Sequence, residues 1–167
     1  FYSALSEFNE VADYLRNVIP LKFDQKKFIH GKKIEDEITK ICSENNQKFE
    51  LINLTLAVNS NSQELFRPYK DIDFYKDAKP RSPEFFEIKY NDEFFGVAWG
   101  CLNAVRRKLD NKDIRGFILK KQGFSIGKRE NLVKYFPRRN TFFDRYSGEV
   151  IIVNPKILPN AARNDIE

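Results

Sequence analysis

The sequence predicts a single α+β domain, and three observations support that class. Helical patterns occupy the first quarter of the chain, a strand-like alternation follows, and the last third mixes short strands with a short helix. With 167 residues, 41% of them apolar, the chain is long enough for one hydrophobic core and short for two. Sixteen Phe and seven Tyr residues make this core unusually rich in aromatic rings, each of which buries a large area.

The N-terminal part of the chain is expected to be helical. Apolar residues recur at helical spacing over residues 3–18, which predicts an amphipathic helix that cannot continue through Pro20. A connector, IPLKFDQKKF, is expected to be extended. A second helix is predicted over residues 34–45, where acidic residues at its start favour the first turn.

Alternating or continuous apolar residues predict a series of strands in the rest of the chain. Residues 64–67 are expected to pair back on the first strand as a hairpin, and residues 68–83, with three prolines, are expected to form a surface loop. Short helical segments are expected at 105–109 and 130–136. The predicted strands are 49–58, 84–90, 94–102, 116–121, 124–126 and 149–153.

Composition argues against several classes of protein. His30 is the only histidine and has no nearby cysteine, so we expect neither a zinc site nor a His-dependent mechanism. Cys42 and Cys101 stand in apolar patterns and are expected to be buried, reduced thiols of a cytoplasmic protein. The longest apolar run, 94–102, is far short of the ~20 residues that span a bilayer, so no membrane partner is expected. The absence of Met suggests a part of a longer protein.

Positive charge is concentrated in one stretch of the chain. The net charge is +5, whereas residues 104–139 alone carry +9, which favours an anionic partner or simply a solvated face. Aromatic residues at 117, 124, 135 and 136 are interleaved with the charges, as in nucleic-acid-binding surfaces, although their strand-like alternation predicts that the rings face inward. The candidate basic residues are Arg106, Arg107, Lys108, Arg115, Lys120, Lys121, Lys128, Arg129, Arg138 and Arg139.

The segment LPNAARNDIE, residues 158–167, contains the best candidate for phosphate chemistry. Asn160 is a typical N-cap residue, and Ala161 and Ala162 favour a helix after it. Arg163 would then stand in the first turn, where free N–H groups favour an anion, and its planar fork suits two phosphate oxygens. The pattern N-x-x-R is short, and a capped helix with an exposed arginine would match it equally well.

The order of motifs toward the C-terminus resembles a known family. The span from GFSIGKRENLVKYFP to GEVIIVNPKILPNAARNDIE is similar to the middle, or transducer, domain of heat-shock-chaperone-like GHKL ATPases. This superfamily includes gyrase B, the heat-shock chaperones, histidine kinases and MutL. The likeness extends more loosely to residues 11–24 and to FRPYK at 66–70, and it is nearest to uncharacterised prokaryotic members.

The resemblance implies a fold, a partner and a site. The fold would be a ribosomal-protein-S-five domain-2-like transducer fold, with an antiparallel or mixed sheet and helices packed on one face. Residues 1–167 would be one domain of a longer ATPase, and a homodimer of the full-length protein would be compatible with the resemblance. Arg163 would contact the γ-phosphate of ATP, bound with Mg²⁺ by the protein's own N-terminal ATPase domain, and Asn160 and Glu167 would support the loop. Glu167 replaces the family's glutamine, and Asn164 replaces an acidic residue.

Three functions therefore remain open from the sequence. The leading hypothesis is a transducer domain of an ATP-dependent, chaperone-like ATPase. The motifs that bind ATP itself are absent from the 167 residues, so this chain alone is expected to be inactive. The alternatives are a basic nucleic-acid-binding module and a non-catalytic protein-interaction domain.

Overall fold

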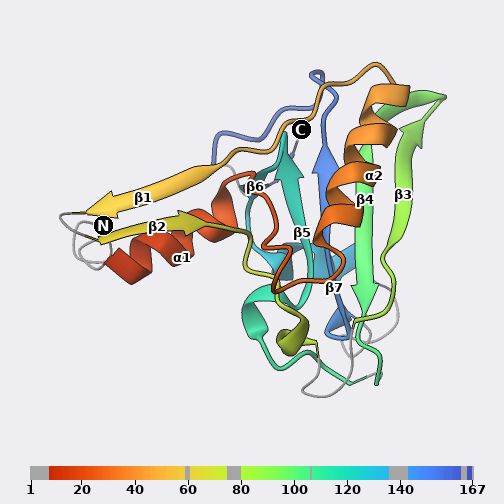
Figure 1. The fold of residues 1–167 in the computed structure, drawn as a ribbon. Coiled ribbons are helices and arrows are strands. Elements are labelled where there is room, and N and C mark those ends of the chain that lie inside the picture. The colour runs from red at the N-terminus through yellow and green to blue at the C-terminus, as the bar shows by residue number, and fades with distance from the viewer. Residues whose placement is uncertain are drawn as a thin grey trace.

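The computed structural model describes residues 8–58, 61–74, 80–105, 107–135, 143–162 and 165–166, with the backbone alone at 58 and 61. It is an α+β structure with a five-stranded mixed sheet in the order β3-β4-β7-β5-β6 and a separate hairpin, β1-β2 (Figure 1). The elements are α1 (Phe8–Val18), α2 (Gly31–Glu44), β1 (Leu54–Val58), β2 (Asn61–Leu65), η1 (Asp71–Asp73), β3 (Glu84–Tyr90), β4 (Glu93–Leu102), η2 (Lys112–Ile114), β5 (Gly116–Lys121), β6 (Phe124–Ile126), η3 (Arg129–Tyr135) and β7 (Tyr146–Ile152), where η marks a 3₁₀ helix.

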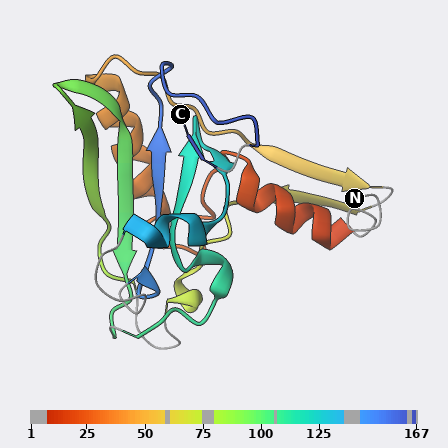
Figure 2. The ribbon, with the colours of Figure 1, turned by 180° about the vertical axis from the view of Figure 1, so that it is seen from behind.

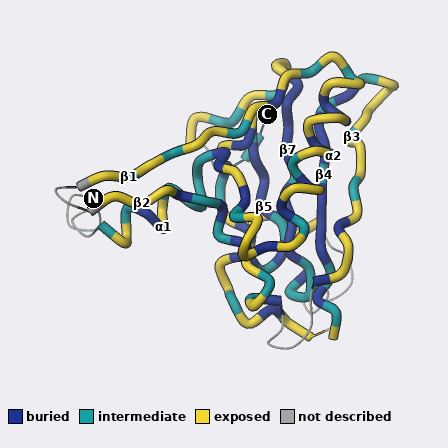
Figure 3. Tube along the Cα trace, viewed as in Figure 1, coloured by how far each residue is buried: buried dark blue, intermediate teal, exposed yellow. Residues whose placement is uncertain are grey.

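An arm made of α1, β1 and β2 projects from the body that contains the large sheet (Figures 1 and 2). The arm has a small apolar core of its own, in which Ala12, Leu21 and Leu65 are buried. Figure 3 shows that the arm is otherwise exposed or half-buried, whereas the deeply buried residues lie in the body.

One face of the large sheet packs against α2, which lies over β4 (Figure 1). Ile34 and Ile38 of α2 are buried in the same cluster as Val97 and Trp99 of β4. Aromatic rings surround the indole of Trp99, whose ring centroid lies 5.2 Å from that of Tyr69. The main core of the domain therefore lies on this face, and it is as aromatic as the composition predicts.

The opposite face of the sheet is covered by η3 and by the chain after β7 (Figure 2). Leu132 of η3 packs on a buried cluster formed by Leu119, Ile126 and Ile152. The resemblance had led us to expect helices on one face only. In the structure, helical segments lie on both faces of the sheet. The sheet is mixed because β5 and β7 are parallel while the other neighbours are antiparallel.

Most predicted elements are confirmed. Strands β3, β5 and β6 have the predicted bounds, and Asn91 and Asp92 form the predicted turn, with φ of 47° and 61°. The first helix is confirmed from Phe8 onward, while residues 3–7 lie outside the described part of the chain. Residues 61–65 pair with β1 as a hairpin, slightly before the predicted 64–67.

Three boundaries differ from the prediction, each for a long-range reason. Strand β1 begins only at Leu54, because Ile52 makes a single bridge to Leu21 instead of continuing the hairpin. Strand β7 begins at Tyr146, because this polar start pairs with β4 and β5. The described residues of 105–109 form a turn and a bend, not a helix, and the N–H of Leu109 bonds Asp144 O (3.0 Å).

The burial of the thiols agrees with the sequence analysis, whereas helix α2 begins at Gly31 and not at residue 34, so the acidic residues expected at its start lie beyond its first turn. Cys42 and Cys101 are buried and free. Burial raises the pKa of Cys42 to about 11 and that of Cys101 to about 12, which makes both thiols unreactive near neutral pH. None of the described helices has the length and apolar character needed to cross a membrane.

The close contact between β4 and β7 gives a test of the fold. A Cβ at Gly148 would clash with the carbonyl oxygen of Trp99 and lie 2.7 Å from Cε1 of Phe117. We expect Gly148→Ala to lower the free energy of unfolding by about 1–3 kcal/mol, because backbone cannot move aside as a side chain can. Urea unfolding measures this. Gly100→Ala is the control, because the close contact of its Cβ would be with the ring of Phe117, at 2.9 Å, and a ring can shift. Its loss of unfolding free energy should be measurably smaller than that of Gly148→Ala.

Candidate functional site

The C-terminal segment that carries the predicted site forms a closed loop, residues 159–166. Pro159 and Ile166 make an antiparallel bridge, and the N–H of Asn160 donates to Asp165 O at 3.0 Å. Of the predicted site residues, Asn160 lies in this loop. Arg163, Asn164 and Glu167 lie outside the described residues.

Asn160 helps to close the loop through its side chain. Its Oδ1 accepts from the N–H of Asp165 at 3.4 Å, five residues farther along the chain, and residues 161–162 form a turn. The described residues show this bond across the loop, while residues 163 and 164, which the expected first helical turn would include, lie outside the described part of the chain, so the N-cap stays a prediction. A supporting role for Asn160 in the loop remains compatible with this geometry.

The loop is fastened to the body through η3. Ile157 and Ile166 pack on the same apolar cluster as Leu132, and Lys134 Nζ lies 3.4 Å from Asp165 Oδ2. The hydrogen bond from the N–H of Ile166 lowers the pKa of Asp165, and Lys134 adds to this effect. Asp165 is therefore charged at neutral pH and can hold this ion pair.

A second polar feature, buried on the α2 face of the sheet, was not predicted from the sequence. The carboxylate of Glu149, in the middle of β7, is 1% exposed. It accepts a hydrogen bond from Tyr69 (3.0 Å) and one from the indole of Trp99 (3.3 Å), and it pairs with Arg67. A further cation, the Nζ of Lys120 on β5, lies 3.5 Å from its Oε1. We call Arg67, Tyr69, Trp99, Lys120, Arg129 and Glu149 the buried ionic network.

Arg129 joins this network to the start of η3. Its Nη2 donates to the hydroxyl of Tyr69 at 2.8 Å, and its Nε donates to Asp113 O at 2.8 Å. Its Nη1 donates to Gly116 O and Gly148 O, at 2.7 and 3.2 Å. One guanidinium therefore connects η3, β5 and β7, and its charge is balanced largely by carbonyl dipoles.

The electrostatics of the network follow from burial and from an excess of positive charge. Burial alone would raise the pKa of Glu149, but the attraction of Arg67, Lys120 and Arg129 outweighs burial and the pKa is lowered. Burial lowers the pKa of Lys120 to about 8, although Glu149 opposes this shift. Glu149 is therefore ionised throughout the physiological pH range.

The sequence contains signals of this network, but they were interpreted as parts of a strand, of a family resemblance and of a basic surface. Glu149 is the lone charge in the strand pattern GEVIIV, and Arg67 belongs to FRPYK, noted above only as part of a resemblance. Lys120 and Arg129 were counted among the basic residues of a possible surface, yet both are buried. A lone charge inside an apolar strand is the signal that would have indicated a buried partner.

Three other candidate basic side chains of the same stretch bond to the protein itself. Lys121 donates to Asn154 O, Arg115 donates to Asp110 O at 3.3 Å, and Lys108 pairs with Asp144 at 2.8 Å while remaining exposed. Arg107 and Lys128 are exposed, whereas Arg106, Arg138 and Arg139 lie outside the described residues. The described candidates of the stretch are therefore divided between buried, internally bonded and exposed side chains.

The aromatic residues of this stretch behave differently from the prediction. Phe124 and Tyr135 are 48% and 63% exposed, so the expectation that these rings face inward is wrong for both. They stand at the sheet edge and at the end of η3, where no further layer covers them. Phe117 is half-buried and stacks on Tyr146 at 6.1 Å, and Phe136 lies outside the described residues.

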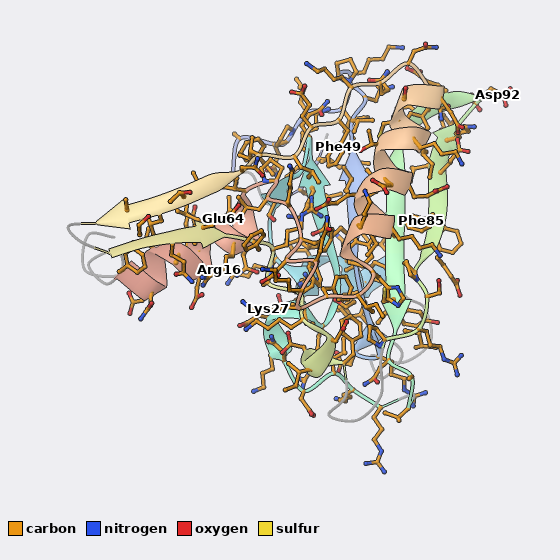
Figure 4. All side chains as sticks on the ribbon, in the orientation of Figure 1. Arg16, Lys27, Phe49, Glu64, Phe85 and Asp92 are labelled. Atoms are coloured by element: carbon orange, nitrogen blue, oxygen red, sulfur yellow. The ribbon has the colours of Figure 1, made fainter. Side chains whose placement is uncertain are left out.

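A polar cavity of about 370 Å³ lies at the junction of the arm and the body. Figure 4 shows Arg16, Glu64 and Lys27 around this junction. Arg67, whose Nη2 has no acceptor among the described residues, belongs to the lining. The charged lining residues are Asp13, Asp24, Glu64, Asp113, Arg16, Lys27, Arg67 and Lys70, so the two signs balance and the cavity does not select a ligand by charge. No cluster of metal-binding side chains occurs in the described ranges.

The burial of Glu149 can be tested by removing its carboxylate. Glu149→Ala leaves three buried cations facing one another without their shared counter-ion. We expect the free energy of unfolding to fall by about 3–5 kcal/mol. The control is Glu84→Ala, which removes an exposed carboxylate from the edge strand. It should change the free energy of unfolding by less than about 0.5 kcal/mol. Equal effects in urea unfolding would contradict the burial of Glu149.

The lowered pKa of Lys120 predicts a pH dependence. Because this pKa falls from 10.5 in the unfolded chain to about 8 in the folded one, the unfolded chain binds more protons between these values. Stability contributed by this side chain therefore rises with pH across that window. We expect the wild type to gain stability relative to Lys120→Met between pH 8 and 10.5 and to show a constant difference from pH 6 to 7. Urea unfolding at each pH gives the difference, and a flat profile would disprove the shift.

Comparison with known proteins does not assign this chain to a family. The chain matches no protein-family model, and it matches none of the curated proteins.

Proposed function

We propose that this chain is the transducer domain of a chaperone-like GHKL ATPase and that Arg163 contacts the γ-phosphate of ATP held, with Mg²⁺, by the protein's own N-terminal ATPase domain. The closed loop, residues 159–166, supports the proposal, because Arg163 falls within it in the sequence. The loop follows β7, a central strand of the sheet, after the connecting residues 153–158, and it is fastened to η3. The described ends of the loop are thus held next to the sheet, as a segment that has to meet a neighbouring domain requires.

The chemistry required of Arg163 is electrostatic. Arginine is charged at any working pH, and its planar fork matches two phosphate oxygens. In phosphoryl transfer such a group is most valuable where negative charge develops in the transition state, and it needs no proton transfer. In this proposal Asn160 keeps the loop closed through Asp165, and Glu167 orients Arg163 or a water molecule.

Nucleic-acid binding receives less support from the geometry than ATPase transduction does. Backbone binding needs a row of accessible cations. Here Lys120 and Arg129 are buried, and Lys121, Arg115 and Lys108 bond to the protein itself. The exposed ring of Tyr135 has the Nζ of Lys134 over it, 4.9 Å from the ring centroid, but this lysine also pairs with Asp165.

The test uses the full-length protein, in which this chain is joined to its ATP-binding domain. We expect Arg163→Ala to lower ATP turnover by about 10³-fold or more while leaving the dissociation constant for ATP nearly unchanged, because the interaction is made mainly in the transition state. Steady-state kinetics and nucleotide titration give the two quantities. Arg107→Ala, at an exposed position outside the loop, is the control and should keep normal turnover. Unchanged turnover in Arg163→Ala would overturn the proposal and favour an interaction domain.

A further inference from the structure

We infer that η3 is a positioning element for the loop, with Arg129 fixing one end of it to the buried ionic network and Lys134 joining the other end to Asp165. The inference rests on the proposed function for its effect on ATP turnover, but its structural part stands independently. Arg129 and Lys134 are positioning residues, since neither is proposed to touch the nucleotide.

The first end of η3 is held by bonds that are costly to break. The guanidinium of Arg129 is buried and uses all three of its nitrogens as donors, to Asp113 O, Gly116 O, Gly148 O and Tyr69. A buried donor that loses its acceptor has no water to replace it, so each such loss is strongly unfavourable. A shift of this end of η3 would break several of these bonds together, so we regard it as fixed to β5 and β7.

The other end of η3 meets the loop through contacts that are cheaper to break. Leu132 shares an apolar cluster with Ile157 and Ile166, and Lys134 pairs with Asp165 at 3.4 Å. The two side chains of this pair are 58% and 46% exposed, and pairs so exposed to solvent contribute little to stability. The loop is therefore located by η3 but can leave it at small cost.

This asymmetry suits a loop that must meet a second domain. Lys134 follows Arg129 within the same 3₁₀ helix, at a rise of about 2.0 Å per residue, so the position of the residue that meets the loop follows the position of the network. Tyr69 and Arg67 in that network come from the chain just after the arm, and Arg67 Nε donates to Leu21 O at 2.6 Å, just after α1. A movement of the arm would thus change the position of η3, because it would displace the residues that hold Arg129.

The first experiment reverses the charges of the exposed pair in the full-length protein. We expect Lys134→Glu to lower kcat by about 2- to 5-fold with KM for ATP unchanged, and Asp165→Lys in the same chain to restore it. Lys40→Glu is the matched control, because the pair of Lys40 with Glu37 on α2 has a similar length, 3.3 Å, and similar exposure. No loss of kcat, or no recovery in the double variant, would overturn the role of Lys134.

The second experiment tests the fixed end without using turnover. Arg129→Lys keeps the charge but removes the fork. We expect hydrogen exchange of the Asn160 amide, which reports loop closure, to become about tenfold faster while amides shared by β3 and β4 keep their rates. A uniform increase across the sheet would mean general destabilisation and would overturn a positioning role, as would unchanged exchange at Asn160.

The two proposals can fail separately. If exchange at Asn160 responds to Arg129→Lys but Arg163→Ala leaves turnover unchanged, η3 positions the loop and the ATPase function is wrong. If Arg163→Ala abolishes turnover while Lys134→Glu and Arg129→Lys affect neither kcat nor exchange at Asn160, the function holds and the inference about η3 is overturned.

Discussion

The buried carboxylate of Glu149 is the constraint around which the rest of the domain is arranged. An ionised carboxylate can stay in the middle of a sheet only when charged and hydrogen-bonding groups replace the water that it has lost. Those groups come from segments far apart in the sequence: Arg67 and Tyr69 follow the hairpin, Trp99 lies on β4, and Lys120 lies on β5. Satisfying one side chain therefore fixes the arm, the sheet and the aromatic core relative to one another.

Strand β7 connects this constraint to the candidate site, because one of its faces carries Glu149 and the other supports the C-terminal loop. Glu149 and Ile151 point to the α2 face, while Val150 and Ile152 point to the face covered by η3 and the C-terminal segment. The period of two along a strand places the network and the support of the loop back to back. Gly148 directly precedes Glu149 on β7, at a point where the close approach of β4 leaves no room for a side chain.

Periodicity in the sequence was sufficient for the elements but not for the polar interior. Apolar alternation located β3, β5 and β6, because each strand buries residues in a local pattern. The start of β7, the parallel pairing with β5 and the destination of Arg129 depend on partners distant in sequence, which no local pattern contains. Asn160 shows the limit at the site: its residue type indicated a cap, but no local pattern contained the bridge between Pro159 and Ile166 or the bond from Asp165 that closes the loop.

The small separate core of the arm has a consequence for how this domain loses its structure. Ala12, Leu21 and Leu65 bury little area compared with the body, so the arm forms a weaker cooperative unit and opens at a lower free energy than the large sheet. Such partial unfolding would proceed along the chain only as far as Arg67, where the hairpin returns to the body and the charge pair begins. The arm can therefore melt and re-form as a hinged extension while the aromatic core stays intact.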